Sequence, residues 1–319
     1  MDNASNAALK DFSSIRGSLE AQSPKTLVVA AAHDEHTLEA VFTAAGMLPM
    51  QYILVGDRKR ILDISSGLGV SLSEDAIVDR DDNAGCARAA VSLIREGRGD
   101  VLMKGLIETG TLLKAVLDRD TGIRDSSLMS HLAMLEVPAY HKLIAVTDGG
   151  IVTNPFLQQK VDIVRNAVAF LSRVGLRRPK IAALCAVESV SDKMPETEDA
   201  AELQAMCERG ELGDCILEGP ISFDIAVDPK AAKVKSSASK ITGDVDVLLV
   251  PKIAAGNILV KSLVNWGGAK MAGCVLGAKA PVVLVSRGST AEEKFLSILL
   301  CLRAGLQGGV PYGFPVDPG

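Results

Sequence analysis

The N-terminal third of the chain alternates between short aliphatic runs and amphipathic segments, and this alternation constrains the fold more than any other feature. The aliphatic runs have the length and β-branched content of buried strands, whereas the segments between them have helical spacing. Strands are predicted at 26–32, 52–55, 77–78 and 100–103, and helices at 35–45, 58–66 and 83–98, the last capped by Asn83. Because strands that alternate with helices form a mostly parallel sheet, this part is predicted to be an α/β domain.

The rest of the chain continues this pattern and adds one antiparallel pair. The strand-like runs 131–137 and 142–147 are close enough in sequence to pair antiparallel. Further strands are predicted at 180–186, 215–217, 245–250, 271–276 and 281–285, and further helices at 159–174, 195–209, after Gly256 and at 290–302. Gly219-Pro220 is predicted to form a rigid turn. The charged, turn-rich segment 118–125 indicates a domain boundary near 120–130.

The composition narrows the class of protein. Hydrophobic residues make up 48% of the chain and aromatic residues only 3%, so the cores are aliphatic, which favours parallel α/β architecture. The net charge of −5 argues against a general nucleic-acid or anionic-membrane binder. No apolar run reaches the ~18–20 residues that span a bilayer, and the polar N-terminus is unlike a signal peptide. We therefore expect a soluble, cytoplasmic protein.

Common cofactor and metal motifs are missing from the sequence. It contains no GxGxxG after the first predicted strand, no GxxxxGK[ST] and no GxSxG. The six cysteines form no CxxC pair, and the four histidines have no metal-ligand spacing. Reduced thiols and the absence of a metal site are the expectation.

The segment 281–294 combines a predicted strand end with a predicted helix start. The strand stops at Ser286-Arg287, and Ser289-Thr290 followed by two glutamates is typical of a capped helix. A hydroxyl and a guanidinium beside a helix N-terminus can hold an anion. The same residues also fit an ordinary strand-to-helix turn with a solvated arginine.

Other polar residues follow predicted strands or open predicted helices. Lys104-Gly105 follows the strand 100–103, with Thr109 and Thr111 a few residues later, and Asn257 opens a helix that carries Lys261 one turn further on. Each of these also has an ordinary interpretation, as a helix cap or a solvated lysine, and Thr147-Asp148 is better explained by an Asx-type turn. Together, however, Lys104, Lys261, Lys279 and Arg287 would suit a ligand with several phosphates.

The order of these motifs is similar to that of a known family. The motifs are Lys104-Gly105 with Thr109, Ser130-His131, Val146-Thr-Asp148, Glu188, Lys193-Met194, Gly219-Pro220 with Asp224, Gly243-Asp-Val-Asp246, Gly256-Asn257 with Lys261, and Ser286-Arg287 with Lys294. The series resembles the phosphate acetyltransferase/phosphate butyryltransferase family, and it looks closer to the butyryltransferase branch. The resemblance covers roughly residues 25 to 305.

The resemblance implies a fold and a reaction. The family fold consists of two α/β domains with a central cleft, similar to isocitrate and isopropylmalate dehydrogenases, usually in a homodimer. The first domain would comprise 1–126 plus 275–319, and the second 127–274. The implied reaction is the reversible transfer of a short acyl group, acetyl or butyryl, between CoA and inorganic phosphate. It needs no metal or redox cofactor, and CoA and phosphate are substrates.

The resemblance also implies roles for individual residues. Ser286 and Arg287 match the catalytic Ser-Arg pair, which contacts phosphate and polarises the acyl group. Acetyltransferase members carry an aspartate seven residues after that serine, where this chain has Glu293. Lys104 stands where those members have a serine, so the phosphate pocket is expected to be rebuilt around lysine. Lys104, Gly105, Thr109, Thr111, Asn257, Lys261 and Lys279 are the expected phosphate and CoA contacts.

Two other functions stay open from the sequence. One is a metal- and NAD-dependent dehydrogenase on the same fold, although Asp224, Asp244 and Asp246 form no convincing metal cluster in the sequence. The other is a CoA-binding protein without turnover. The sequence does not fix the acyl-chain length, because pocket size depends on residues that only the fold brings together.

Overall fold

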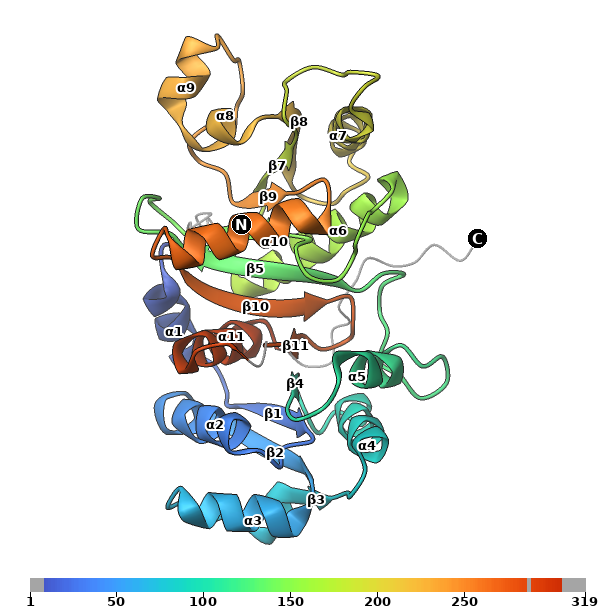
Figure 1. The fold of residues 1–319 in the computed structure, drawn as a ribbon, viewed down its shortest axis with the longest axis vertical. Helices are drawn as coiled ribbons and strands as arrows, with labels where there is room; N and C mark the ends of the chain where they lie inside the picture. The colour runs from blue at the N-terminus through green and yellow to red at the C-terminus, as the bar shows by residue number, and fades with distance from the viewer. Residues whose placement is uncertain (1–8, 286–287, 306–319) are drawn as a thin grey trace, which may run out of the picture. The chain divides into compact units, whose positions relative to one another are not determined.

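The computed structural model describes residues 9–285 and 288–305 and divides into two compact units. The unit that we call the N-terminal unit contains Phe12–Ser127 and residues 272–305. The unit that we call the middle unit contains residues 9–11 and Leu128–Met271. Figure 1 labels most of their helices and strands. No helix in the described ranges is long and apolar enough to cross a membrane.

The N-terminal unit is built on a mostly parallel sheet, as predicted. Its strands are β1 (Lys25–Ala30), β2 (Met50–Gly56), β3 (Ile77–Asp79), β4 (Val101–Lys104), β11 (Val282–Val283) and β10 (Lys270–Leu276). The first two residues of β10, Lys270 and Met271, are assigned to the middle unit. Their order is β3-β2-β1-β4-β11-β10, and only β10 runs antiparallel to its neighbour β11. The helices are α1 (Phe12–Glu20), α2 (Glu35–Met47), α3 (Arg58–Gly67), α4 (Asn83–Arg95), α5 (Thr109–Val116) and α11 (Ala291–Ala304).

Aspartate caps start three of these helices. Asp34, Asp57 and Asp82 precede α2, α3 and α4, and each side chain accepts a hydrogen bond from a backbone N–H in the first turn. The prediction that Asn83 caps its helix was therefore wrong by one residue. Asp82 Oδ1 accepts from Gly85 N at 2.7 Å, and Asn83 is the first helical residue. Adjacent Asp and Asn are equally good caps, so the sequence alone does not separate them.

The strands of the middle unit follow in the order β5-β6-β9-β7-β8. The strands are β5 (Ser130–Glu136), β6 (Ile144–Thr147), β9 (Val247–Leu249), β7 (Lys180–Leu184) and β8 (Ile216–Ile221). β5 and β6 form the predicted antiparallel pair, and the other neighbours are parallel. The helices are α6 (Leu157–Val174), α7 (Pro195–Glu208), α8 (Phe223–Val227), α9 (Pro229–Val234) and α10 (Ile253–Asn265).

The region after residue 215 differs from the prediction. Gly219-Pro220 does not end a strand but lies within β8. Because β8 is the last strand in its sheet order, a residue without an N–H is tolerated there. The short helices α8 and α9 were not predicted, since five or six residues carry little periodic signal.

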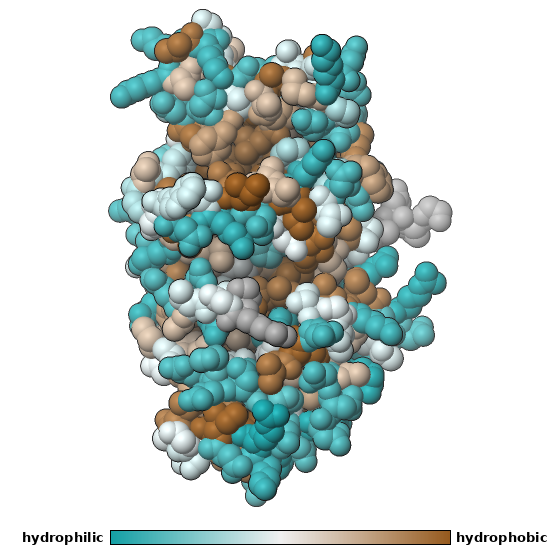
Figure 2. Space-filling model, in the orientation of Figure 1, coloured by the Kyte–Doolittle hydropathy of each residue, from teal (hydrophilic) through white to brown (hydrophobic). Residues whose placement is uncertain are grey.

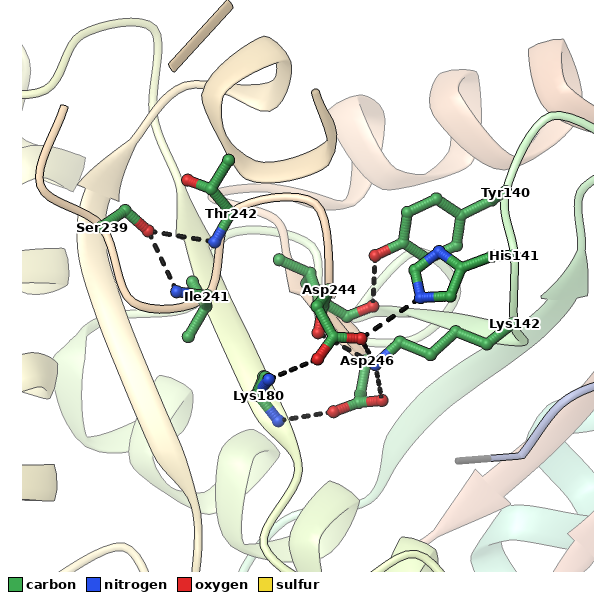
Figure 3. A network of polar contacts seen from close by, with 10 residues as sticks. Tyr140, His141, Lys142, Lys180, Ser239, Ile241, Thr242, Asp244 and Asp246 are labelled. Atoms are coloured by element: carbon green, nitrogen blue, oxygen red, sulfur yellow. Dashed lines mark hydrogen bonds and ion pairs between the residues drawn. The ribbon is translucent and has the colours of Figure 1, made fainter. Parts of the chain in front are cut away.

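A network of charged side chains joins the amino ends of three strands in the middle unit (Figure 3). Lys142, just before β6, is 4% exposed, and its Nζ lies 2.6 Å from Oδ1 of Asp246, which is 6% exposed and precedes β9. The other carboxylate oxygen, Oδ2, accepts from the N–H of Lys180, the first residue of β7, at 2.8 Å. Asp244 contacts both lysine ammonium groups.

The lysines keep the network charged. Burial alone would raise the pKa of Asp244, but hydrogen bonds and charge from Lys142 and Lys180 outweigh it and hold that pKa well below its usual range. The carboxylate is therefore ionised at neutral pH and pairs with the lysine ammonium groups. Because their charges have partners, Lys142 and Asp246 can be buried between the strands.

We predict that Asp246→Ala lowers the free energy of unfolding by at least about 2 kcal/mol, because it removes an ion pair and leaves the Lys180 N–H unpaired. Chemical denaturation measures the change. The control is Asp214→Ala, whose carboxylate is 76% exposed and 3.8 Å from Arg178, and whose loss should change stability by less than about 0.5 kcal/mol. Equal effects of the two substitutions would contradict the role given to Asp246.

Candidate functional site

The carboxyl end of β4 carries the first candidate residue, Lys104. β4 pairs in parallel with β1 on one side and with β11 on the other, in the registers Ala30↔Lys104 and Val283↔Met103. The three strands therefore end at the same edge of the sheet, where ligands bind in open α/β folds. β11 also ends at this edge, at Val283.

Gly105 is required by close packing against the end of β1. Its N–H donates to the Ala30 carbonyl at 2.9 Å, and the N–H of Leu106 donates to the Ala31 carbonyl at 2.8 Å. A Cβ added to Gly105 would lie 2.3 Å from the Ala31 oxygen, which is part of the backbone and has no room to move. The turn after β4 thus requires a glycine at position 105, because the two backbone segments approach so closely.

The ammonium of Lys104 is directed at the same turn. Its Nζ donates to the Ile107 carbonyl at 2.8 Å and to the Gly105 carbonyl at 3.2 Å, and the residue is half-buried. The turn leads directly into α5, whose first turn contains Thr109 and Thr111. Glu108, not Thr109, occupies the N-cap position of this helix. The structure therefore brings Lys104 and the two threonines into one short segment.

Lys279 lies at the other edge of this sheet. It is in the connection between β10 and β11, before the amino end of β11, and its N–H donates to the Ile123 carbonyl at 2.7 Å. Because β11 runs parallel to β4, the amino end of β11 is remote from the edge where β4 ends. Lys104 and Lys279 therefore lie toward opposite edges of this sheet.

Glu293 takes part in the helix cap at the start of α11. Thr290 Oγ1 accepts from the Glu293 N–H at 3.1 Å, and Glu293 Oε2 accepts from the Thr290 N–H at 3.0 Å. This reciprocal pair is a capping box, and it confirms the predicted capped start. The carboxylate therefore has a structural role of its own. Ser286 and Arg287 lie outside the described residues.

Asn257 and Lys261 lie on α10 in the middle unit. The helix starts at Ile253 with Lys252 as N-cap, so Asn257 is in the second turn and does not open the helix as predicted. The two residues are four apart and share one face. Asn257 Nδ2 is 3.5 Å from the Gly149 carbonyl oxygen.

Asp148 organises the turn that α10 approaches. Its carboxylate is 2% exposed and accepts from the N–H groups of Gly150 at 2.7 Å, Ile151 at 2.9 Å and His131 at 2.9 Å. The interpretation of Thr147-Asp148 as an Asx-type turn is confirmed. Burial lowers the pKa of His131, so this ring is neutral at pH 7.

A polar cluster that the sequence did not reveal lies at the carboxyl ends of β7 and β8. Ser222 Oγ is 2.5 Å from Glu188 Oε1 and 2.6 Å from Asp224 Oδ1. Lys235 Nζ lies 3.0 Å from each carboxylate. The Ser222 hydroxyl and then Lys235 lower the pKa of Asp224 to about 2, so the carboxylate is charged at neutral pH. No local pattern links Lys235 to Glu188, which is 47 residues away.

The aspartates considered for a metal site are engaged otherwise. Asp224 pairs with Lys235, and Asp244 and Asp246 pair with Lys142 at the opposite edge of the sheet. Across the described part of the chain, no group of three or more His, Cys, Asp or Glu residues is placed to hold a metal ion.

Comparison with known proteins identifies the family. The profile described as phosphate acetyl/butaryl transferase matches residues 83–302. The chain belongs to this family. Phosphate butyryltransferase from Clostridium acetobutylicum is 38% identical over 92% of this chain and 97% of its own length. Phosphate acetyltransferase from Thermotoga maritima is 40% identical over 86% of this chain and 94% of its own length.

Solved structures agree with this assignment to the phosphate acetyl/butyryl transferases. The crystal structure of a branched-chain phosphotransacylase from Enterococcus faecalis V583 matches with a TM-score of 0.78 and 34% identity, and it covers 88% of this chain and 98% of that one. A 4-hydroxythreonine-4-phosphate dehydrogenase from Klebsiella pneumoniae matches with a TM-score of 0.55 over 88% of this chain and 99% of that one. At 14% identity, the second match shows a shared fold alone.

We predict opposite effects for two glycine substitutions near Lys104. Gly105→Ala should destabilise the protein by more than about 2 kcal/mol, because the new methyl group overlaps the Ala31 carbonyl. Gly110→Ala, with nothing within 4 Å of the added Cβ in the first turn of α5, should stabilise it by about 0.5–1 kcal/mol. Thermal denaturation measures both. A Gly105→Ala protein as stable as the parent would contradict the close approach of Gly105 to the Ala31 carbonyl.

Proposed function

We propose that this protein catalyses the reversible transfer of a short acyl group between CoA and inorganic phosphate to give an acyl phosphate. The observation that carries this proposal is the nearly full-length similarity to relatives named for that activity. A probable phosphate butyryltransferase from Bacillus subtilis is 41% identical over 88% of this chain. Acetyltransferases and butyryltransferases match about equally well, so the proposal covers acetyl and butyryl groups.

The proposed reaction needs charge stabilisation at two places. When phosphate attacks the thioester carbonyl, negative charge develops on the carbonyl oxygen and CoA leaves as a thiolate. We assign Arg287 and the Ser286 hydroxyl to that oxygen and to the phosphate, because fixed donors at a developing charge lower the barrier. In the reverse direction the CoA thiol, with a pKa near ~8.5, must lose its proton. A carboxylate such as Glu293 would accept it.

Lys104, Gly105, Thr109 and Thr111 are our candidates for the phosphate site. Three strands of the N-terminal unit end beside this segment, and its ammonium and hydroxyl groups are donors suited to an anion. We assign Asn257, Lys261 and Lys279 to CoA, a long molecule that carries phosphates away from its thiol. The separation of Lys279 from Lys104 supports a contact with CoA better than one with the transferred phosphate.

In this proposal the chain folds into two α/β domains with a central cleft, similar to isocitrate and isopropylmalate dehydrogenases. The first domain comprises 1–126 plus 275–319, and the second comprises 127–274. The proposed enzyme is a cytoplasmic homodimer that uses CoA and phosphate as substrates and needs no further cofactor. Exposed apolar side chains in the middle unit support an interface with a second copy. Phe223 on α8 and Ile258 on α10 are 41% and 66% exposed, and Figure 2 shows apolar atoms in the hollow between these two helices.

The two alternatives have less support. A metal- and NAD-dependent dehydrogenase would need free aspartates, and Asp224, Asp244 and Asp246 are paired with lysines. The likeness to a dehydrogenase is confined to the fold. A CoA-binding protein without turnover would bind CoA but form no acyl phosphate, so an activity measurement separates it from the enzyme.

We predict that the purified protein releases CoA from acyl-CoA substrates of two to six carbons only when phosphate is present. Thiol release measured across this series also gives the chain-length preference. Arg287→Ala should lower kcat/KM by about 30- to 150-fold, which corresponds to a loss of about 2–3 kcal/mol of transition-state stabilisation. Arg88→Ala, on the exposed face of α4, is the control and should keep full activity.

Two outcomes would contradict this proposal. Inactivity of the parent protein with every acyl-CoA of the series would refute the function. Near-normal activity of Arg287→Ala in an active parent would refute only the role of Arg287.

We further predict that Glu293→Gln lowers kcat by at least ~100-fold while leaving the melting temperature unchanged. Glutamine keeps the capping box with Thr290, whereas it cannot accept the thiol proton. Glu292→Gln, in the same exposed first turn, should keep full activity. If Glu293→Gln is as active as the parent, the carboxylate serves only the helix cap.

A further inference from the structure

Two cysteines of the middle unit lie side by side. Cys207 is in the last turn of α7, and Cys215 directly precedes β8. Their sulfur atoms are 3.7 Å apart, and the Cys207 thiol lies 3.5 Å from the Cys215 carbonyl oxygen. A disulfide has a sulfur–sulfur distance of about 2.05 Å, so the two side chains must rotate to bring the sulfurs into bonding distance.

A cavity gives small molecules access to both thiols. Its volume is about 510 Å³, and its lining includes Cys207 and Cys215 together with Arg178, Gln204 and Lys240. Cys207 is half-buried, whereas Cys215 is 8% exposed. The lining carries the cationic groups of Arg178 and Lys240 and also the carboxylates of Glu188, Glu208 and Glu218. It therefore offers partners of both signs to a compound of the glutathione type, which carries carboxylates and ammonium groups.

We propose that Cys207 and Cys215 are a redox modification site, at which a low-molecular-weight disulfide of the glutathione type converts the two thiols into a reversible intramolecular disulfide. None of the residues assigned to acyl transfer belongs to this site. The inference therefore stands whether or not the proposed function is correct.

The exchange proceeds in two balanced steps. The Cys207 thiolate, the more exposed of the two, attacks one sulfur of the small disulfide, breaks its S–S bond and releases one thiol. The Cys215 thiolate then attacks the Cys207 sulfur, forms the protein disulfide and releases the second thiol. The protein thiols lose two electrons to the small disulfide, and their two protons end on the released thiols.

The order of attack follows from the surroundings of the two thiols. Burial, and then the neighbouring Cys207, raise the pKa of Cys215, which suppresses its thiolate while Cys207 is free. Once Cys207 is bound in a mixed disulfide, the contribution of Cys207 to the raised pKa of Cys215 is removed, whereas that of burial remains. Cys207 is therefore the attacking residue and Cys215 the resolving residue.

The disulfide would reinforce an existing connection between α7 and β8. Gln204, one turn before Cys207, already accepts the Gly219 N–H of β8 at 3.0 Å. The new bond would close the loop 208–214 and fix the end of the helix to the start of the strand. Such a link is compatible with the fold because it joins parts that are already in contact.

The chain contains its own control for accessibility. The thiols of Cys274 and Cys301 are also adjacent, but both residues are 0% exposed. If the oxidant acts on the folded protein, this buried pair stays reduced. Oxidation of both pairs would indicate unfolding.

The experiment uses the folded full-length chain and glutathione disulfide, followed by alkylation, trypsin without reductant, and mass spectrometry. Cleavage after Lys193, Arg209 and Lys230 places Cys207 and Cys215 in separate peptides, 194–209 and 210–230, with one cysteine each. We expect these peptides to be cross-linked in most molecules and separated again by dithiothreitol. Peptides 271–279 and 295–303, which carry the buried pair, should stay unlinked.

Substitutions make the test specific. Cys215→Ser should abolish the cross-link and leave glutathione bound to Cys207, whereas Cys185→Ser should leave the cross-link unchanged. The proposal is overturned if the parent protein carries glutathione on Cys207 without cross-linking, if neither thiol reacts, or if the buried pair is cross-linked to the same extent.

Discussion

Strand β4 is hydrogen-bonded on both sides, to β1 and to β11, and this pairing determines where the candidate residues of the N-terminal unit lie. It aligns three carboxyl ends at one edge and presses Gly105 against the backbone of Ala31. The turn that results carries the Lys104 ammonium and leads into the first turn of α5. The same pairing puts Lys279 at the opposite edge. The register of β4 thus places Lys104 beside the first turn of α5 and keeps Lys279 away from the proposed phosphate site.

The two edges of the middle sheet have different electrostatic characters. At the amino edge, Lys142 and Asp246 are buried together, so their charges stabilise the fold and are not available to a ligand. At the carboxyl edge, Glu188, Asp224 and Lys235 form a cluster whose side chains are 42–49% exposed. Screening by water makes each of these exposed ion pairs a weak contribution to stability. This contrast agrees with the general position of ligands at carboxyl ends of parallel strands.

Much of the fold follows from local sequence patterns, whereas the site does not. The alternation of aliphatic runs and helical spacing predicted the parallel strands, and Thr290 with Glu293 predicted the capped start of α11. Gly219-Pro220 was misread because its place in an edge strand depends on sheet order, which no local pattern encodes. Lys235 was missed because its partner Glu188 is distant in sequence. Contacts between distant segments are set by topology, and only the structure supplies them.

In the proposed reaction, a phosphate oxygen attacks the acyl carbon of acyl-CoA. The direct measurement is phosphorus NMR of the product formed from acyl-CoA and inorganic phosphate labelled with ¹⁸O at all its oxygens, since each label shifts the resonance. Direct attack retains every label in the acyl phosphate, including the bridging oxygen. A product that has lost one label, or no acyl phosphate at all, would contradict this direct attack.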